Sequence, residues 1–335
     1  MAIARVECPK AKSKEPHIYK MYNILMPNDA LISVIVPTYR EEKNIAPVIK
    51  RLTQVLKPFT YELLFVDDGS TDGTVSEIKK AAKKNSSIKL ISFYRNFGHQ
   101  MALSAGYQAA QGRCVITIDA DLQDPPETIP DMIAQWKKGA FIVYAKRKTR
   151  DGDGFFKSFT ASFFYRFMNL LSDTPIPEEV GDFRLIDRQV VDYLNSLPEQ
   201  SLFLRGLVAW GGYPASYVYF KRGKRFAGQT HYPFSKMLNF ALEGITSFSI
   251  KPLRLATYLG FFAAVVGFLG IIYAILGKIF LPSHWVTGWT ALFVGIMFLG
   301  GVQLITIGII GEYIAKIYKE VQKRPRFLIK EKLNV

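Results

Sequence analysis

The chain has 335 residues and a formal net charge of +15. Its length suits one large domain with a second module, and its two cysteines, Cys8 and Cys114, offer neither a disulfide framework nor a metal-binding spacing, which suits a reducing compartment. The charge would suit nucleic acid, but no recognition helix, zinc spacing or RNA-binding aromatic motif occurs, so we expect no nucleic-acid partner.

The N-terminal half predicts an α/β domain. Residues 1–30 are polar, rich in lysine and without the apolar core of a secretory signal, so we predict a flexible arm there. From Leu31 onward, short apolar runs alternate with helical stretches, which predicts a mainly parallel sheet buried on both faces. The expected strands are 32–37, 62–66, 89–93, 115–118 and 141–144, and the expected helices include 44–56, 74–84 and 100–111.

Polar residues follow each predicted strand, at the edge where such sheets bind ligands. Asp67 and Asp68 follow the second strand, and a carboxylate there can accept hydrogen bonds from a nucleobase or ribose. Asp119 and Asp121 follow the fourth strand, with Gln123 in the same loop. Aspartates are common in turns, but oxygen ligands at this edge suit Mg²⁺ or Mn²⁺ carrying a substrate diphosphate.

Several runs of residues match a known family. Residues 34–45 (Val-Ile-Val-Pro-Thr-Tyr-Arg-Glu-Glu-Lys-Asn-Ile), 66–72 (Val-Asp-Asp-Gly-Ser-Thr-Asp) and 119–127 (Asp-Ala-Asp-Leu-Gln-Asp-Pro-Pro-Glu) resemble glycosyltransferase family 2, the inverting enzymes with a GT-A fold. Residues 181–185 (Gly-Asp-Phe-Arg-Leu) and 225–233 (Arg-Phe-Ala-Gly-Gln-Thr-His-Tyr-Pro) make the chain similar to the polyprenyl-phosphate glycosyltransferases, relatives of dolichol-phosphate mannosyltransferase.

This resemblance implies roles for individual residues. The residues implied to bind the nucleotide are Pro37, Tyr39, Glu41, Asp68 and Asp119. The implied ligands of the metal are Asp119, Asp121 and Gln123. The implied catalytic residues are Asp121, Arg147 and Asp182, the last as either a base or an orienting group. The implied ligands of an acceptor phosphate are Arg147, Arg150 and Arg184. The Gln-x-x-Arg-Trp motif of processive synthases is absent, which implies a single transfer.

The C-terminal part predicts a membrane module. Residues 255–311 contain one Lys, no Arg and no acid, in two apolar runs that each exceed the ~20 residues needed to cross a bilayer. Apolar positions at helical spacing over 155–171 and 235–252 predict helices lying in the membrane interface. We therefore predict a catalytic domain over 31–234, the juxtamembrane helix at 235–252, two transmembrane helices within 253–315 and a basic tail over 316–335.

Basic residues flank the apolar runs, and the turn between the runs holds only Lys278. The positive-inside rule then predicts that the catalytic domain and both termini are cytoplasmic, in a multi-pass protein of the cell (inner) membrane. Basic residues at the membrane edge also favour anionic lipid headgroups as partners.

We expect an enzyme that transfers one sugar from a nucleotide-sugar donor to undecaprenyl phosphate. Our preferred sugar is glucose, with UDP-glucose as the donor, followed by mannose and a modified arabinose. Whether the chain forms a homo-oligomer is left open. A membrane-tethered nucleotide-binding oxidoreductase would need Gly-x-Gly-x-x-Gly after the first strand, where residues 38–43 read Thr-Tyr-Arg-Glu-Glu-Lys. A non-enzymatic lipid-binding scaffold would have no use for the acidic loop.

Overall fold

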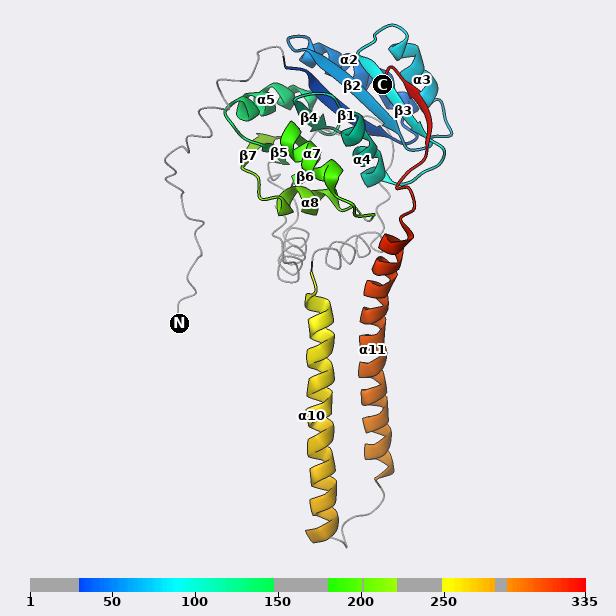
Figure 1. Ribbon diagram of the computed structural model, residues 1–335, viewed down its shortest axis with the longest axis vertical. Helices are drawn as coiled ribbons and strands as arrows, with labels where there is room; N and C mark the ends of the chain where they lie inside the picture. The colour runs from blue at the N-terminus through cyan, green and yellow to red at the C-terminus, as the bar shows by residue number, and fades with distance from the viewer. Residues whose placement is uncertain (1–29, 148–179, 201, 222–248, 281–287) are drawn as a thin grey trace.

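The computed structural model describes residues 30–147, 180–200, 202–221, 249–280 and 288–335. These residues form a sheet with helices on both faces, from which two long helices project (Figure 1). The strands are β1 (Ile32–Thr38), β2 (Tyr61–Asp67), β3 (Ile88–Phe93), β4 (Cys114–Thr117), β5 (Ile142–Arg147), β6 (Val180–Asp187), β7 (Ala215–Phe220) and β8 (Ile329–Leu333). The helices are α2 (Glu42–Leu56), α3 (Thr74–Ala82), α4 (His99–Ala109), η1 (Pro126–Thr128), α5 (Ile129–Lys137), α7 (Arg188–Ser196), α8 (Leu204–Trp210), α10 (Lys251–Phe280) and α11 (Trp289–Gln322).

The strands lie in the order β7-β5-β6-β4-β1-β2-β3-β8. Neighbouring strands pair in parallel except at β6, which is antiparallel to β4 and β5, and at β8, which is antiparallel to β3. The prediction of an α/β fold with a mainly parallel sheet is therefore confirmed. The two antiparallel strands were not predicted.

Side chains of the central strands alternate between two hydrophobic cores. In β1, Val34 and Val36 pack with α2, α3 and α5, whereas Ile35 packs with α4, α7 and α8 on the other face. Because both faces of the sheet are covered, a strand can be apolar at every position. This is why the sequence shows continuous apolar runs instead of alternating apolar and polar residues.

Strand direction decides which loops meet. The parallel strands β1 to β4 end at one edge, and β6 begins at that edge because it runs against β4. The loop after β2 turns at Gly69, whose φ is +73°, and a Cβ added there would lie 2.5 Å from the Arg95 carbonyl carbon. Only glycine lets the loops after β2 and β3 approach this closely.

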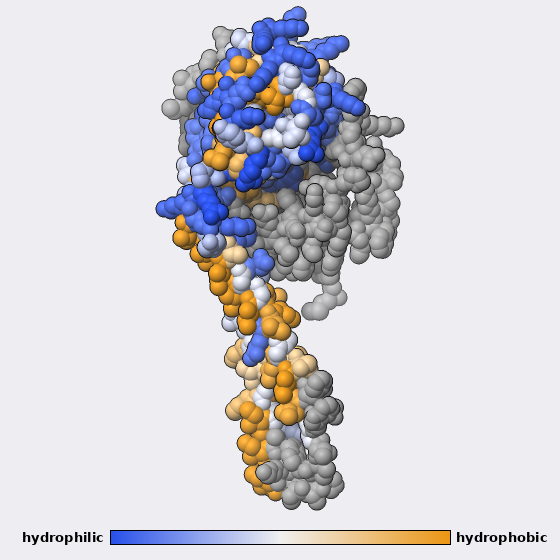
Figure 2. All heavy atoms as spheres, turned by 90° about the vertical axis from the view of Figure 1, so that its right-hand side faces the viewer, coloured by the Kyte–Doolittle hydropathy of each residue, from blue (hydrophilic) through white to orange (hydrophobic). Residues whose placement is uncertain are grey.

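Helices α10 and α11 lie side by side and leave the sheet together (Figure 1). The segments Lys251–Tyr273 and Gly295–Gln322 are long and apolar enough to cross a membrane, and none of the second segment is buried. Hydrophobic residues cover much of this projection, whereas the domain above it is mostly hydrophilic (Figure 2). The two expected apolar helices are thus present. The predicted interfacial helix at 155–171, and residues 235–248 of the other, lie outside the described residues.

After α11 the chain returns to the sheet. We predicted a basic tail over 316–335, but α11 continues to Gln322 and the last residues form β8 against β3. Phe327 stacks on Phe93 with ring centroids 5.0 Å apart, and Asn334 Nδ2 donates to the Ile88 carbonyl at 2.9 Å. Both ends of the helical hairpin therefore join the same domain.

Candidate active site

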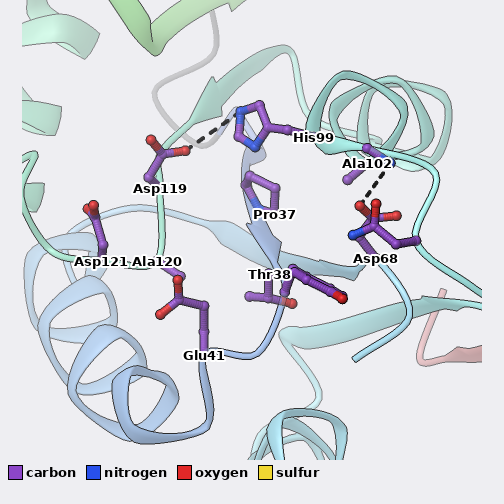
Figure 3. Close-up of a pocket in the computed structure, with 12 residues that line it drawn as sticks. Pro37, Thr38, Glu41, Asp68, His99, Ala102, Asp119, Ala120 and Asp121 are labelled. Atoms are coloured by element: carbon purple, nitrogen blue, oxygen red, sulfur yellow. Dashed lines mark hydrogen bonds and ion pairs between the residues drawn. The ribbon is translucent and has the colours of Figure 1, made fainter. Parts of the chain in front are cut away.

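A pocket of about 290 Å³ lies beyond the carboxyl ends of β1, β2 and β4. Six residues that the sequence singled out line it: Pro37, Tyr39, Glu41, Asp68, Asp119 and Asp121. Figure 3 shows Asp119, Asp121 and Glu41 on one side of this pocket and Asp68 on the other. The convergence follows from the parallel strands, which deliver their loops to one edge.

The two aspartates at the carboxyl end of β2 have different surroundings. Asp67 is fully buried and accepts hydrogen bonds from Ser92 Oγ and the Ser70 N–H. Asp68 lines the pocket, where it accepts the N–H groups of Phe97 (2.7 Å) and Gly98 (2.9 Å). Burial raises the pKa of Asp68 above its ordinary value despite these two bonds. Asp67 therefore holds its loop, whereas Asp68 both holds the neighbouring loop and faces the pocket.

Asp119 and Asp121 form the candidate metal site. Asp121 Oδ1 accepts the Gln123 N–H at 3.0 Å, while Gln123 itself does not line the pocket. Burial raises the pKa of Asp119, and the charges of Asp182 and Asp121 raise it further against the opposing effect of His99. A divalent cation would relieve this crowding of negative charge.

The donor set fits Mg²⁺ or Mn²⁺. Among the described residues, no group of three or more His, Cys, Asp or Glu side chains could hold a metal ion. Mg²⁺ is usually bound by one or two carboxylates, with substrate phosphates and water completing the shell. Asp119 and Asp121 supply that minimal set.

Asp182 lies at the start of β6 and is only 7% exposed. Arg184 Nη2 donates to its Oδ1 at 3.0 Å, and Arg205 donates through Nε to Oδ1 (3.1 Å) and through Nη2 to Oδ2 (2.9 Å). His99 Nε2 lies 3.4 Å from Oδ2. Burial would raise the pKa of Asp182, but the hydrogen bond from His99 and the two guanidinium charges outweigh it and hold the pKa well below its usual range.

His99 connects this carboxylate with the pocket. Its Nε2 also lies 3.8 Å from Asp119 Oδ1, and Figure 3 shows the ring facing Asp119 across the pocket. Burial lowers the pKa of His99, but the hydrogen bond to Asp182 and the charges of Asp119 and Asp182 raise it above its ordinary value.

The three predicted acceptor arginines have different positions. Arg147 ends β5, 3.8 Å from Asp124 Oδ1, and its Nη2 lies 3.4 Å from where a Cβ on Gly181 would stand. It is 37% exposed and so remains open to solvent beside the start of β6. Arg184, also implied to be a ligand of the acceptor phosphate, is 1% exposed and contacts Asp182 from the core side. Arg150 lies outside the described residues.

Sequence reasoning missed two members of this arrangement. His99 stood in a loop assigned to the site edge, but no role was given to it. Arg205 is a single charged residue within the apolar run 202–210. A charge in such a run is a signal for a buried partner of opposite charge, and it could have led to Asp182.

Two family models match the chain. The model described as glycosyl transferase family 2 matches residues 33–194, and the model described as GtrB C-terminal hairpin matches residues 251–317. The first covers the sheet from β1 to β6, and the second covers the two long helices. Together with the sheet topology, this match confirms the GT-A fold class that the resemblance implied.

Curated relatives match over nearly their whole length. The chain is 46% identical over 302 residues to the SfII prophage-derived bactoprenol glucosyl transferase of Shigella flexneri, covering 90% of this chain and 97% of that protein. It is 44% identical over 301 residues to the prophage bactoprenol glucosyl transferase homolog of Escherichia coli K12, covering 89% and 98%. An uncharacterized glycosyltransferase of Synechocystis is 46% identical over 305 residues, covering 90% and 95%.

Solved structures are more distant. The mannosyltransferase of Pyrobaculum calidifontis, in complex with GDP-Man and Mn²⁺, has a TM-score of 0.42 and 18% identity, covering 87% of this chain and 93% of that one. Mannosyl-3-phosphoglycerate synthase from Rubrobacter xylanophilus has a TM-score of 0.45 and 16% identity, covering 67% and 76%.

Proposed function

The chain belongs to glycosyltransferase family 2, and from that premise we propose that it transfers one glucose from UDP-glucose to undecaprenyl phosphate at the cytoplasmic face of the cell membrane. The observation that carries the proposal is the similarity to bactoprenol glucosyl transferases, which extends through the catalytic domain and the helical hairpin alike. An acceptor that is itself a membrane lipid gives the hairpin a purpose, because the hairpin keeps the pocket at the surface where that lipid is found.

The donor is assigned to the pocket beyond β1, β2 and β4. Tyr39, Glu41 and Asp68 would surround the base and ribose, and Asp119 and Asp121 would face the diphosphate. When bound, Mg²⁺ or Mn²⁺ would act as a Lewis acid for the negative charge that grows on the leaving diphosphate. The clustering of Asp119 and Asp121 and the raised pKa of Asp119, which is due first to burial and then to nearby carboxylates, support this assignment.

The acceptor phosphate needs little activation. Its second pKa is near ~6, so at neutral pH it is mostly a dianion. One phosphate oxygen attacks the anomeric carbon of glucose while the bond from that carbon to the donor diphosphate breaks, which inverts the anomeric configuration and releases UDP. Arg147, half-buried beside Gly181, is our proposed ligand for the incoming phosphate.

Charge favours a cytoplasmic active site, and the chain path favours an even number of membrane crossings. Basic residues flank the hairpin at Lys251, Arg254, Lys316 and Lys319. The pairing of β8 with β3 supports an even number of membrane crossings, because the chain leaves the catalytic domain and rejoins it.

A donor panel tests the proposal. Purified full-length protein is incubated with undecaprenyl phosphate, Mg²⁺ or Mn²⁺, and radiolabelled UDP-glucose, GDP-mannose or a nucleotide-linked modified arabinose. We expect label from UDP-glucose to enter the lipid fraction. Preferential transfer from another donor would reassign the sugar, and no transfer from any donor would refute the proposed reaction.

A further inference from the structure

Both oxygens of the Asp182 carboxylate accept hydrogen bonds from arginine side chains. Oδ1 accepts from Arg184 and Arg205, and Oδ2 accepts from Arg205 with His99 3.4 Å away. A carboxylate held by donors on each oxygen cannot rotate freely, and paired guanidinium bonds are among the strongest and most directional in proteins. Asp182 is thus held in one orientation.

The two arginines hold Asp182 from different sides. Arg184 is 1% exposed and lies two residues along β6 from Asp182, so both side chains leave the same face of the strand. Arg205 is 30% exposed and comes from α8. Arg184 is therefore part of the core, whereas Arg205 closes the carboxylate from the accessible side.

The start of α8 is attached to the start of α4, which carries His99. Gln100 Oε1 accepts the Leu204 N–H at 3.1 Å, so the residues next to His99 and Arg205 contact each other. Just before α8 in the chain, the Gln200 N–H donates to both carboxylate oxygens of Glu320 in α11 at 2.9 Å. The start of α8, which carries Arg205, is consequently tied to the pocket helix α4, and the segment before α8 is tied to the helical hairpin.

We propose that Arg205 is a positioning residue for sugar transfer, which acts by holding the Asp182 carboxylate fixed beside His99 and Asp119. Asp182 then serves as an oriented negative charge, with no proton to accept. This inference rests on the proposed function, because it concerns the residue that orders the site for that reaction.

The test compares Arg205→Ala and Arg205→Lys with a matched control, Arg51→Ala. Arg51 makes the same two-bond contact with Glu127, through Nε (3.1 Å) and Nη2 (2.6 Å), on the protein surface, and neither residue lines the pocket. For each full-length variant, kcat and KM are measured with UDP-glucose and undecaprenyl phosphate, together with UDP binding and thermal unfolding.

We expect Arg205→Ala to lower kcat by ~10²-fold, the loss typical of a displaced active-site group, with UDP binding and the KM for UDP-glucose unchanged. Arg205→Lys should recover part of the rate, because an ammonium group restores the charge but not the paired geometry. Arg51→Ala should retain wild-type kinetics.

A double variant separates positioning from direct binding. If Arg205 acts through Asp182, Arg205→Ala should add little to the loss already caused by Asp182→Asn, because residues that act as one unit are not additive. Losses that multiply would overturn the inference and make Arg205 an independent ligand. So would equal losses of kcat and UDP binding, which indicate a structural role, or wild-type kinetics in Arg205→Ala.

The two proposals fail in distinguishable ways. A wild-type protein that transfers no sugar refutes the proposed reaction, and the role of Arg205 falls with it. An active wild type with unaffected Arg205 variants refutes the role of Arg205 alone.

Discussion

Replacing Asp121 with alanine should stop nearly all sugar transfer while leaving the domain folded. The side chain is 8% exposed, and its Oδ1 accepts a hydrogen bond from the Gln123 N–H. Losing one such bond costs about 1 kcal/mol of the free energy of unfolding. Burial is the main reason that the pKa of Asp119 is raised, but the charge of Asp121 adds to it, so removing that charge offsets part of the cost.

The effects on stability and on turnover should therefore differ widely. A loss of about 1 kcal/mol lowers the melting temperature of a domain of this size by ~2–4 °C. A divalent ion at a leaving phosphate is worth several kcal/mol. Since about 1.4 kcal/mol is a factor of ten in rate, the loss of kcat should be on the order of 10² to 10³-fold.

The assay measures initial rates of label transfer from UDP-glucose to undecaprenyl phosphate for Asp121→Ala and the isosteric Asp121→Asn. Glu127→Ala is the control, because Glu127 lies in η1 just after that loop but is 57% exposed and pairs with Arg51. Near wild-type turnover in either Asp121 variant, or full wild-type activity in excess chelator, would refute the assignment of this carboxylate to a metal.

Three further outcomes are expected. Arg147→Ala should weaken use of the lipid phosphate far more than binding of UDP-glucose, and equal losses would reassign Arg147 to the donor diphosphate. A Ser283→Cys variant should react with an impermeant thiol reagent outside intact cells, whereas Lys332→Cys, on the exposed side of β8, should react only after lysis; outside labelling at 332 would contradict an even number of crossings. Burial would raise the pKa of Asp182, but His99 and the arginines hold this pKa low. The Asp182 carboxylate therefore stays ionised as the pH falls through ~6, where the acceptor phosphate takes up a proton. The acidic fall in kcat/KM should consequently persist in Asp182→Asn, and its disappearance would make Asp182 the titrating group.

Much of the fold was predictable because its signals are local. The five apolar runs became β1 to β5 with ends shifted by at most three residues, since a buried parallel strand must be apolar along its length. Their loops converged because parallel strands end together, which brought Asp68 and Asp119 to one pocket. The functional roles of these residues remain predictions.

The rest depended on long-range pairing that no local pattern specifies. His99 lies near both Asp119 and Asp182 only because β6 runs antiparallel to β4. The sequence of residues 181–185 does not indicate the direction of that strand. Arg205 meets Asp182 across 23 residues of sequence. The last strand did carry a signal, since Ile329 and Leu333 alternate with Lys330 and Lys332, a pattern typical of a charged edge strand.

Strand β8 follows α10 and α11 in the chain, yet it completes an edge of a sheet whose strands β1 to β7 are synthesised before those helices. Until α10, α11 and β8 have left the ribosome, β3 carries unpaired backbone groups along that edge. Exposed edges are templates for pairing with other chains, and domains generally fold as synthesis proceeds. Folding of this domain therefore finishes only after both long helices have been synthesised, and a fragment that ends before α10 would carry an open edge able to recruit a second copy.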